Sequence, residues 1–212
     1  MIEPSPLALN RLPRQTLHHA WAPKLGRVIM LNSTAQLGLW ALLEAHPGVT
    51  RYCERPSWPG DEEPSPAPDF WALRDGKPVW LALRQEAPAA AEGEGEEPSP
   101  AEASGVQTIT ADELDRHRVW IANWLSLLPY LGVDAWPELE SLREPVADFF
   151  RQEASFDDAE RHFARLDPVL VRTAVVVGLH QGHLYSAELL VRPWDGRTRV
   201  TRCPPHVSHA PQ

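Results

Sequence analysis

The chain has 212 residues, 43% of them hydrophobic, and a formal net charge of −9 at pH 7. This length and apolar content suit one or two small domains with a buried core, and the acidic balance taken alone argues against a nucleic-acid-binding protein. Two cysteines provide neither a disulfide framework nor a metal-binding set. The first residues lack the apolar core of a signal peptide, and no apolar run approaches the roughly 18 residues of a membrane helix. We therefore expect a cytoplasmic protein with no membrane partner.

Residues 1–25 carry Pro, Arg and His without clear periodicity and are expected to form an N-terminal arm. In this arm the adjacent His18 and His19 could be metal ligands or simply exposed side chains. The pattern then predicts, in chain order, a strand at 26–30, a helix at 34–45, a strand at 49–54, a Pro-rich loop at 55–68, a hairpin at 69–84 and a strand at 106–109.

Local signals place the ends of these elements. Asn32 or Ser33 can cap the helix, because a short side-chain oxygen satisfies the free N–H groups of a helix start. In the hairpin, the Asp75-Gly76 pair supplies the positive φ that a tight turn needs.

The segment 85–104 contains six Glu and no Lys or Arg, and it is rich in Ala, Pro and Gly. This composition buries too little apolar surface to pack, so we expect a disordered acidic loop. After the strand at 106–109, Thr110 predicts a helix start, with Glu113 at the capping-box position. We expect this helix to continue to Leu128.

The last third of the chain changes character. Its pattern predicts helices at 138–152, 156–164 and 168–181 and a strand pair at 184–192 and 198–202, joined by a turn at 193–196. Asp157 and Asp158 suit the first turn of the second helix, near its positive end, and Gly182 ends the third helix. Short helices followed by a two-stranded ribbon are typical of a winged-helix domain.

A helix, a strand, an Asp-led hairpin and a further strand and helix also form the order of a restriction-endonuclease-like core. In such cores, carboxylates from the helix and the hairpin hold Mg²⁺, which activates water, and a Lys stabilises charge at the reacting centre. The sequence therefore favours an α/β fold of this type with a smaller C-terminal helical domain.

Several short segments carry a resemblance to one family. They are Gly26-Arg27-Val28, Ser33-Thr34-Ala35-Gln36, Leu42-Leu43-Glu44, Glu54-Arg55-Pro56 and Pro68-Asp69-Phe70 followed by Asp75-Gly76. Together they resemble the opening of TnsA-type endonuclease subunits of bacterial transposons, and the last third resembles the winged-helix tail of that family. The resemblance implies a nuclease-fold domain at 26–135, a winged-helix-like domain at 136–205 and a tail at 206–212.

The resemblance also fixes the positions of the family's catalytic site, and most of them are changed here. The helix Glu falls on Gln36, the second-strand ligand falls on Ala82 and the Lys falls on Arg84, which stays protonated and does not exchange a proton at ordinary pH. Asp69 is the one family carboxylate retained, as a possible remnant of the metal site or as an ordinary turn residue. Glu44 is a candidate substitute ligand, or else a solvent-facing or salt-bridged Glu.

Basic residues suggest contacts with DNA. Arg27 lies near one end of the chain, whereas Arg192, Arg197 and Arg199 lie on the proposed wing, where they could grip phosphates or line a solvated hairpin edge. The resemblance implies a transposase subunit, a transposition ATPase or DNA ends as partners.

Three hypotheses follow. The first is a TnsA-like subunit that keeps the nuclease fold and binds without cutting, with no cofactor. The second is an active, divergent Mg²⁺-dependent DNA endonuclease that uses Asp69 with Gln36 or Glu44. The third is a winged-helix DNA-binding regulator unrelated to nucleases.

Overall fold

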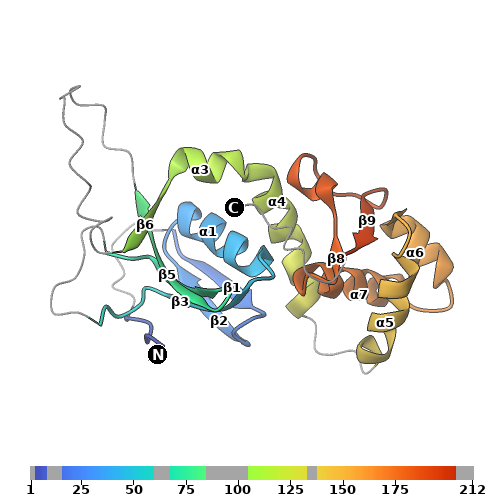
Figure 1. Ribbon diagram of the computed structural model, residues 1–212, viewed down its shortest axis with the longest axis horizontal. Coiled ribbons are helices and arrows are strands. Elements are labelled where there is room, and N and C mark those ends of the chain that lie inside the picture. The colour runs from blue at the N-terminus through green and yellow to red at the C-terminus, as the bar shows by residue number, and fades with distance from the viewer. Residues whose placement is uncertain (1–2, 9–15, 60–66, 85–104, 133–137, 204–212) are drawn as a thin grey trace. The chain divides into compact units, whose positions relative to one another are not determined.

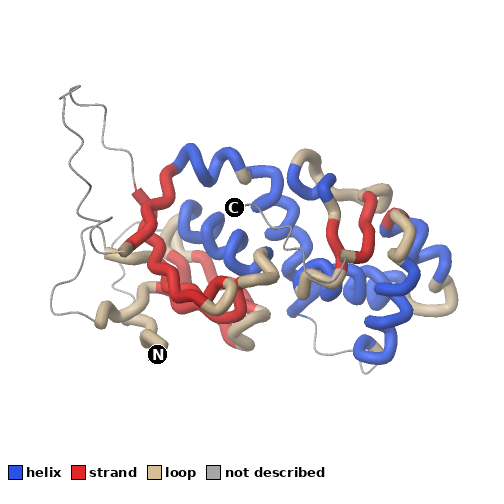
Figure 2. The backbone as a smooth tube through the Cα atoms, in the orientation of Figure 1, coloured by secondary structure: helices blue, strands red, loops and turns tan. Residues whose placement is uncertain are grey.

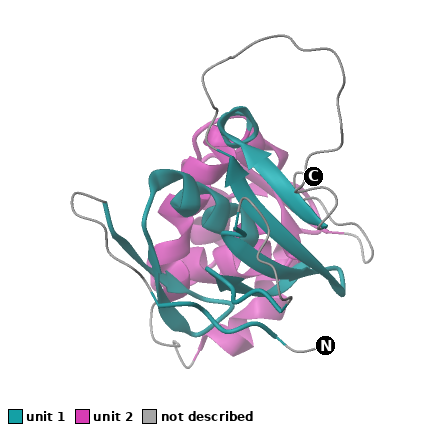
Figure 3. Cartoon of the chain, turned by 90° about the vertical axis from the view of Figure 1, so that its left-hand side faces the viewer, with its two compact units in different colours: residues 1–43, 48–116 teal, residues 44–47, 117–212 magenta. Residues whose placement is uncertain are grey.

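The computed structural model describes residues 3–8, 16–59, 67–84, 105–132 and 138–203. Its contacts divide the chain into two compact units (Figure 3), of which unit 1 is Met1–Leu43 with Gly48–Arg116 and unit 2 is Glu44–Pro47 with His117–Gln212. The division differs from the expected domain boundary, since residues 117–132 belong to unit 2. The expected acidic loop 85–104 and the tail 206–212 lie outside the described residues.

Unit 1 is a mixed α/β unit (Figures 1 and 2). Its elements are β1 (His18–Ala22), β2 (Arg27–Leu31), α1 (Thr34–Ala45, whose last two residues count with unit 2), β3 (Val49–Glu54), β4 (Phe70–Arg74), β5 (Lys77–Arg84), β6 (Val106–Thr110) and α3 (Ala111–Arg116). The predicted helix at 34–45, the strands and the hairpin are confirmed.

The expectation of an irregular arm is wrong for residues 18–22, which form β1 and pair antiparallel with β2. The alternation is hard to recognise in the sequence because the inward positions hold His18 and two Ala, while Trp21, the largest side chain, points outward. Ala22 is fully buried, as are Ile29 and Leu31 on the same face of the pair, whereas Trp21 is exposed.

The main sheet of unit 1 has the order β3-β4-β5-β6, with antiparallel pairs except for the parallel pair β5–β6. Its inner strand β4 starts with three successive buried residues, Phe70, Trp71 and Ala72, so both of its faces are covered. Helix α1 lies against this sheet, and Trp40 donates a 2.7 Å hydrogen bond from its indole to the hydroxyl of Tyr52 on β3. This bond fixes the helix above the strand that leads into the hairpin.

Both predicted N-terminal caps of unit 1 are present. The Ser33 hydroxyl accepts the backbone N–H of Gln36 at 3.0 Å. Thr110 and Glu113 form a reciprocal capping box, in which Thr110 N–H donates to the Glu113 carboxylate at 2.7 Å and Glu113 N–H donates to the Thr110 hydroxyl at 3.2 Å. The single helix expected from here to Leu128 is instead broken at His117, whose φ of −100° and ψ of 10° interrupt the helix.

Unit 2 contains α4 (Arg118–Leu127), the 3-10 helix η1 (Leu128–Gly132), α5 (Leu139–Phe149), β7 (Ala154–Ser155), α6 (Phe156–His162), α7 (Pro168–His180), β8 (Leu184–Tyr185), the 3-10 helix η2 (Ala187–Leu190) and β9 (Arg199–Arg202). The three predicted helices are confirmed as α5, α6 and α7. Asp157 and Asp158 lie in the first turn of α6 as predicted, and Asp158 completes a capping box with Ser155.

The strand expected over 184–192 is wrong beyond Tyr185, because residues 187–190 form η2. Local contacts favour this turn: Leu189 is fully buried, and Glu188 pairs with the Arg192 guanidinium and accepts the Arg199 backbone N–H at 2.7 Å. The small sheet therefore has three short strands in the order β7-β9-β8.

Arg172 on α7 joins separate parts of unit 2. Its guanidinium donates hydrogen bonds to the Glu160 carboxylate and to the Tyr130 hydroxyl. Its Cζ atom lies 5.9 Å from the centre of the Trp194 ring. These partners offset the cost of holding the charged guanidinium partly away from water. Throughout the described residues, no helix is both long and apolar enough to cross a membrane.

Candidate functional site

The structure brings Gln36 of α1 and Asp69, which precedes β4, into direct contact. The Nε2 group of Gln36 donates to Oδ1 of Asp69 at 2.6 Å. The other amide atom, Oε1, accepts the backbone N–H of Asn32 at 2.9 Å. Because Asn32 N–H can only donate, it fixes the amide with its N–H groups facing the carboxylate.

The second oxygen of the Asp69 carboxylate faces β5. Its Oδ2 accepts the backbone N–H of Leu83 at 2.7 Å. Leu83 stands between Ala82 and Arg84, the positions that the sequence resemblance would assign to the second ligand and the Lys. The side chain of Asp69 thus contacts the backbone of β5 between these two positions.

Register explains this convergence. The ladder between β4 and β5 ends with the pair Phe70↔Leu81, and Asp69 and Ala82 are the next residues on the two strands. Ala82 is fully buried and offers no side-chain ligand, whereas Arg84 is exposed at the end of β5, opposite Thr110 of β6. The four positions Gln36, Asp69, Ala82 and Arg84 therefore occupy one corner of unit 1.

Burial raises the pKa of the Asp69 carboxyl above its ordinary value, and the hydrogen bonds from Leu83 and Gln36 partly oppose that rise. The cause is the cost of holding a charge away from water. The two donors, one from α1 and one from β5, make Asp69 a polar cross-link between helix and sheet.

The residues at this corner do not fit a Mg²⁺ site. Mg²⁺ requires several oxygen ligands in an octahedral arrangement, but here one carboxylate is surrounded by N–H donors. Over the described ranges, no group of three or more His, Cys, Asp or Glu side chains gathers where an ion could be held.

Glu44 does not substitute as a ligand. It is fully buried in unit 2, and its Oε2 lies 2.9 Å from Nε2 of His180. This corrects the hypothesis that Glu44 completes the family site: the carboxylate is committed to a histidine.

Arg27, which the sequence suggests as a DNA contact, forms an ion pair with Glu54. Its two terminal nitrogens donate to the two carboxylate oxygens of Glu54 at 2.8 and 2.6 Å, and Glu54 is almost completely buried. This bidentate pair raises the pKa of the guanidinium. Since both ends of the fork are used, Arg27 ties β2 to the end of β3.

The other predicted DNA-contacting residues lie on the loop and strand at the end of unit 2. Arg192, Arg197 and Arg199 are all exposed. Glu188 pairs with Arg192, which lowers the pKa of the Glu188 carboxyl, and Asp195 accepts the backbone N–H of Arg197 at 2.8 Å. Two carboxylates among three arginines reduce the local positive charge that phosphate binding requires.

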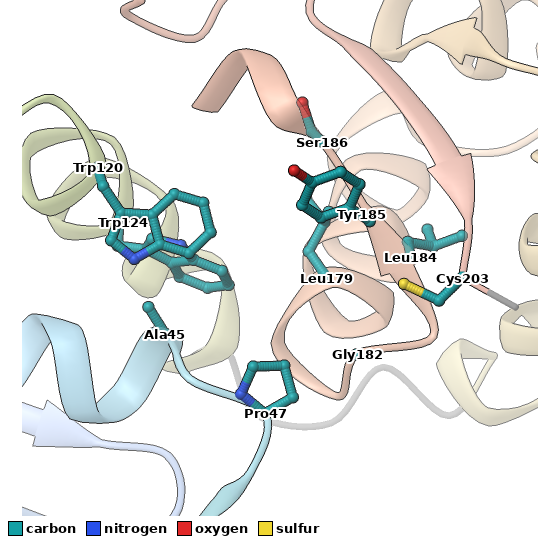
Figure 4. Close-up of a pocket in the computed structure, with 10 residues that line it drawn as sticks. All are labelled: Ala45, Pro47, Trp120, Trp124, Leu179, Gly182, Leu184, Tyr185, Ser186 and Cys203. Atoms are coloured by element: carbon teal, nitrogen blue, oxygen red, sulfur yellow. The ribbon is translucent and has the colours of Figure 1, made fainter. Parts of the chain in front are cut away.

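Unit 2 also contains a small cavity of about 20 Å³, walled by aromatic and aliphatic side chains (Figure 4). Trp120, Trp124 and Tyr185 face it, with Pro47 at one end and Cys203 at the rim. The space is sufficient for about one water molecule. Its walls are mostly apolar and include no charged residue, but among the described residues the Ser186 hydroxyl and the Trp124 indole N–H, both from lining residues, are buried without a hydrogen-bond partner.

The sequence does not reveal the groups that hold Gln36, Asp69 and Glu44 in place. The backbone N–H groups of Asn32 and Leu83 carry no sequence signal, and His180 lies 136 residues from Glu44.

The chain matches no protein-family model, and a search of curated proteins gives no match.

Proposed function

We propose that this protein is a TnsA-like subunit of a bacterial transposition system which keeps a restriction-endonuclease-like core but binds its partners without cutting DNA. The contact between Gln36 and Asp69 carries the proposal. A carboxylate that a nuclease would direct at a metal ion is here held by an amide N–H and a backbone N–H.

The order of elements supports the core. Helix α1 is followed by the antiparallel meander β3-β4-β5, and β6 then pairs parallel to β5. This arrangement accommodates the family's catalytic positions at one corner, although sequence segments far apart supply them. Helices α5, α6 and α7 and the short sheet of unit 2 are compatible with a winged-helix-like domain.

The replacement of the family's metal ligand and Lys supports a role in binding partners and not in cutting DNA. Ala82 cannot bind a cation, and Arg84 cannot serve as a proton-exchanging Lys. The protein is then expected to act in the cytoplasm through a transposase subunit, a transposition ATPase or DNA ends. The competing hypothesis is a divergent endonuclease that still binds Mg²⁺ at Asp69.

Calorimetric titration with Mn²⁺ and Mg²⁺ tests the proposal. We expect no binding to the wild type and binding to the triple variant Gln36→Glu, Ala82→Asp, Arg84→Lys, in which two carboxylates are added beside Asp69. The matched control is the same triple variant carrying Asp69→Ala, which should lose that binding. Circular dichroism establishes that each variant is folded.

Two outcomes would overturn the proposal. Metal binding by the wild type that disappears in Asp69→Ala would favour the endonuclease. A folded triple variant that binds no metal would show that the corner does not have nuclease geometry. Co-purification with a candidate transposase and ATPase, and gel shifts with transposon-end DNA, then identify the partner.

A further inference from the structure

The large apolar side chains that are exposed in the described part of unit 1 gather in one place. They are Leu7, Trp21, Val28 and Met30, exposed by 48%, 45%, 54% and 37%. Trp21 pairs with Val28 across β1 and β2, and Met30 pairs with His19, so three of them occupy the outer face of this two-stranded sheet. We call these four side chains the apolar strip.

Arg55 joins Leu7 to the strip. Its Nε donates to the Leu7 carbonyl at 3.3 Å and its Nη1 donates to the Met30 carbonyl at 2.5 Å. The residue also has a φ of +44°, in the left-handed region that non-glycine residues rarely adopt. Strained residues persist where surrounding contacts hold them, and here the contacts place a cation at one end of the strip.

The size of the strip limits what can cover it. Four side chains exposed by about a third to a half present on the order of 300 Å² of apolar surface, in the range of functional patches. A stable protein–protein interface buries about 800 Å² on each partner. The strip alone is therefore too small for a stable dimer of this chain but is sufficient for a short segment of another protein.

Charge also limits which kind of molecule can cover the apolar strip. Glu54, which precedes Arg55, is paired with Arg27, and Glu3, in the segment that carries Leu7, is paired with Arg51. Arg55 therefore leaves the strip with local positive charge. A second copy of a chain with net charge −9 is repelled at long range, whereas a segment with a single carboxylate complements Arg55. Single-stranded nucleic acid fits less well, because three of the four side chains are not aromatic and binding of its backbone requires several cations.

The edge of β1 supplies a way to hold such a segment. Within the described ranges, no strand other than β2 pairs with β1. An open strand edge can pair with an added strand through backbone hydrogen bonds, while alternate side chains of the added strand pack beside it.

We infer that the apolar strip and the outer edge of β1 bind an extended segment of another protein, one that alternates bulky apolar residues and carries a carboxylate opposite Arg55. This names the surface through which the subunit proposed above holds its partner, and to that extent it rests on that proposal. Metal titration tests the loss of cutting and peptide binding tests this surface, so the two can fail separately.

The test is a selection of random decapeptides displayed on phage against the full-length protein, followed by anisotropy measurements with synthetic copies. We expect enriched peptides to alternate apolar residues with one Asp or Glu, and to bind Val28→Lys at least tenfold more weakly than the wild type. The control is Thr50→Lys, on an exposed position of β3, which should bind as the wild type does. Hydrogen exchange at His18–Ala22 should slow when a peptide is bound.

Several results would overturn the inference. One is that no family of related peptides is enriched by the selection. Another is that the selected peptides bind Val28→Lys as tightly as they bind the wild type. A dimer that sediments as such in the wild type and is lost in Val28→Lys would assign the strip to a second copy. Binding of a fluorescent dT20 oligonucleotide that is lost in Trp21→Ala would assign it to nucleic acid, and a photo-crosslinker at Val28 that reacts within its own chain would assign it to the protein itself.

Discussion

Gln36 and Asp69 lie 33 residues apart in sequence, yet the Gln36 amide donates a 2.6 Å hydrogen bond to the Asp69 carboxylate. The contact joins the first turn of α1 to the start of the β4–β5 hairpin. The amide N–H and the carboxylate attract each other at this separation, whereas two carboxylates would repel each other without a cation. The pair is therefore stable without a metal.

The raised pKa of Asp69 predicts a pH dependence of stability. A folded-state pKa above the ordinary value of 3.8 means that the folded protein binds more protons than the unfolded chain in the window above that value. The free energy of unfolding then falls as the pH rises from 3.8 through the raised pKa. In Asp69→Asn this part of the slope should disappear, as measured by urea unfolding between pH 4 and pH 7. An unchanged slope would contradict the assignment.

Arg27 should be a stability residue and not a DNA-binding residue. Arg27→Ala leaves the buried Glu54 carboxylate without its bidentate partner, and because Arg27 is itself 40% exposed we expect a loss of about 1–3 kcal/mol. Urea unfolding measures this loss. In the double variant Arg27→Ala, Glu54→Gln, which removes the buried charge at this ion pair, part of the stability should return. A weaker affinity for duplex DNA with unchanged stability would refute this role.

Gly196 should resist even the smallest substitution. A Cβ at this position would lie 2.0 Å from Oδ1 of Asp157, in the first turn of α6. Gly196→Ala must displace that carboxylate or the loop, at about 1–3 kcal/mol as for other overpacked sites. Thermal unfolding gives the shift, and the double variant Gly196→Ala, Asp157→Ala should recover most of the loss. If the double variant recovers no stability, the loss arises from the backbone of the loop and not from the Asp157 carboxylate.

Cys53 should be chemically silent in the folded protein. Burial raises the pKa of its thiol to about 11, so little thiolate forms at neutral pH. Ellman's reagent at pH 8 should react with this thiol only after guanidinium unfolding, with Cys53→Ala identifying its contribution to the signal. Rapid reaction of Cys53 in the native state would show that β3 opens locally.

The sequence determined most of the secondary structure of this protein, because local physics specifies it. Ser33, Thr110 and Ser155 start helices through their own hydroxyls, and Asp75-Gly76 sets the hairpin turn with two positive φ angles. The resemblance of several short segments to a known family singles out Gln36, Asp69, Ala82 and Arg84 as positions to compare with the structure.

Only the tertiary structure decided what those residues do. The orientation of the Gln36 amide depends on the N–H of Asn32, and the second oxygen of Asp69 depends on the N–H of Leu83, both of which are backbone groups with no sequence signature. Glu44 and Arg27 looked available in the sequence, but long-range packing commits them to His180 and Glu54. Strand β1 is not evident in the sequence because its pairing with β2 turns His18 and two Ala inward and leaves Trp21 outside, which reverses the usual apolar pattern of a strand.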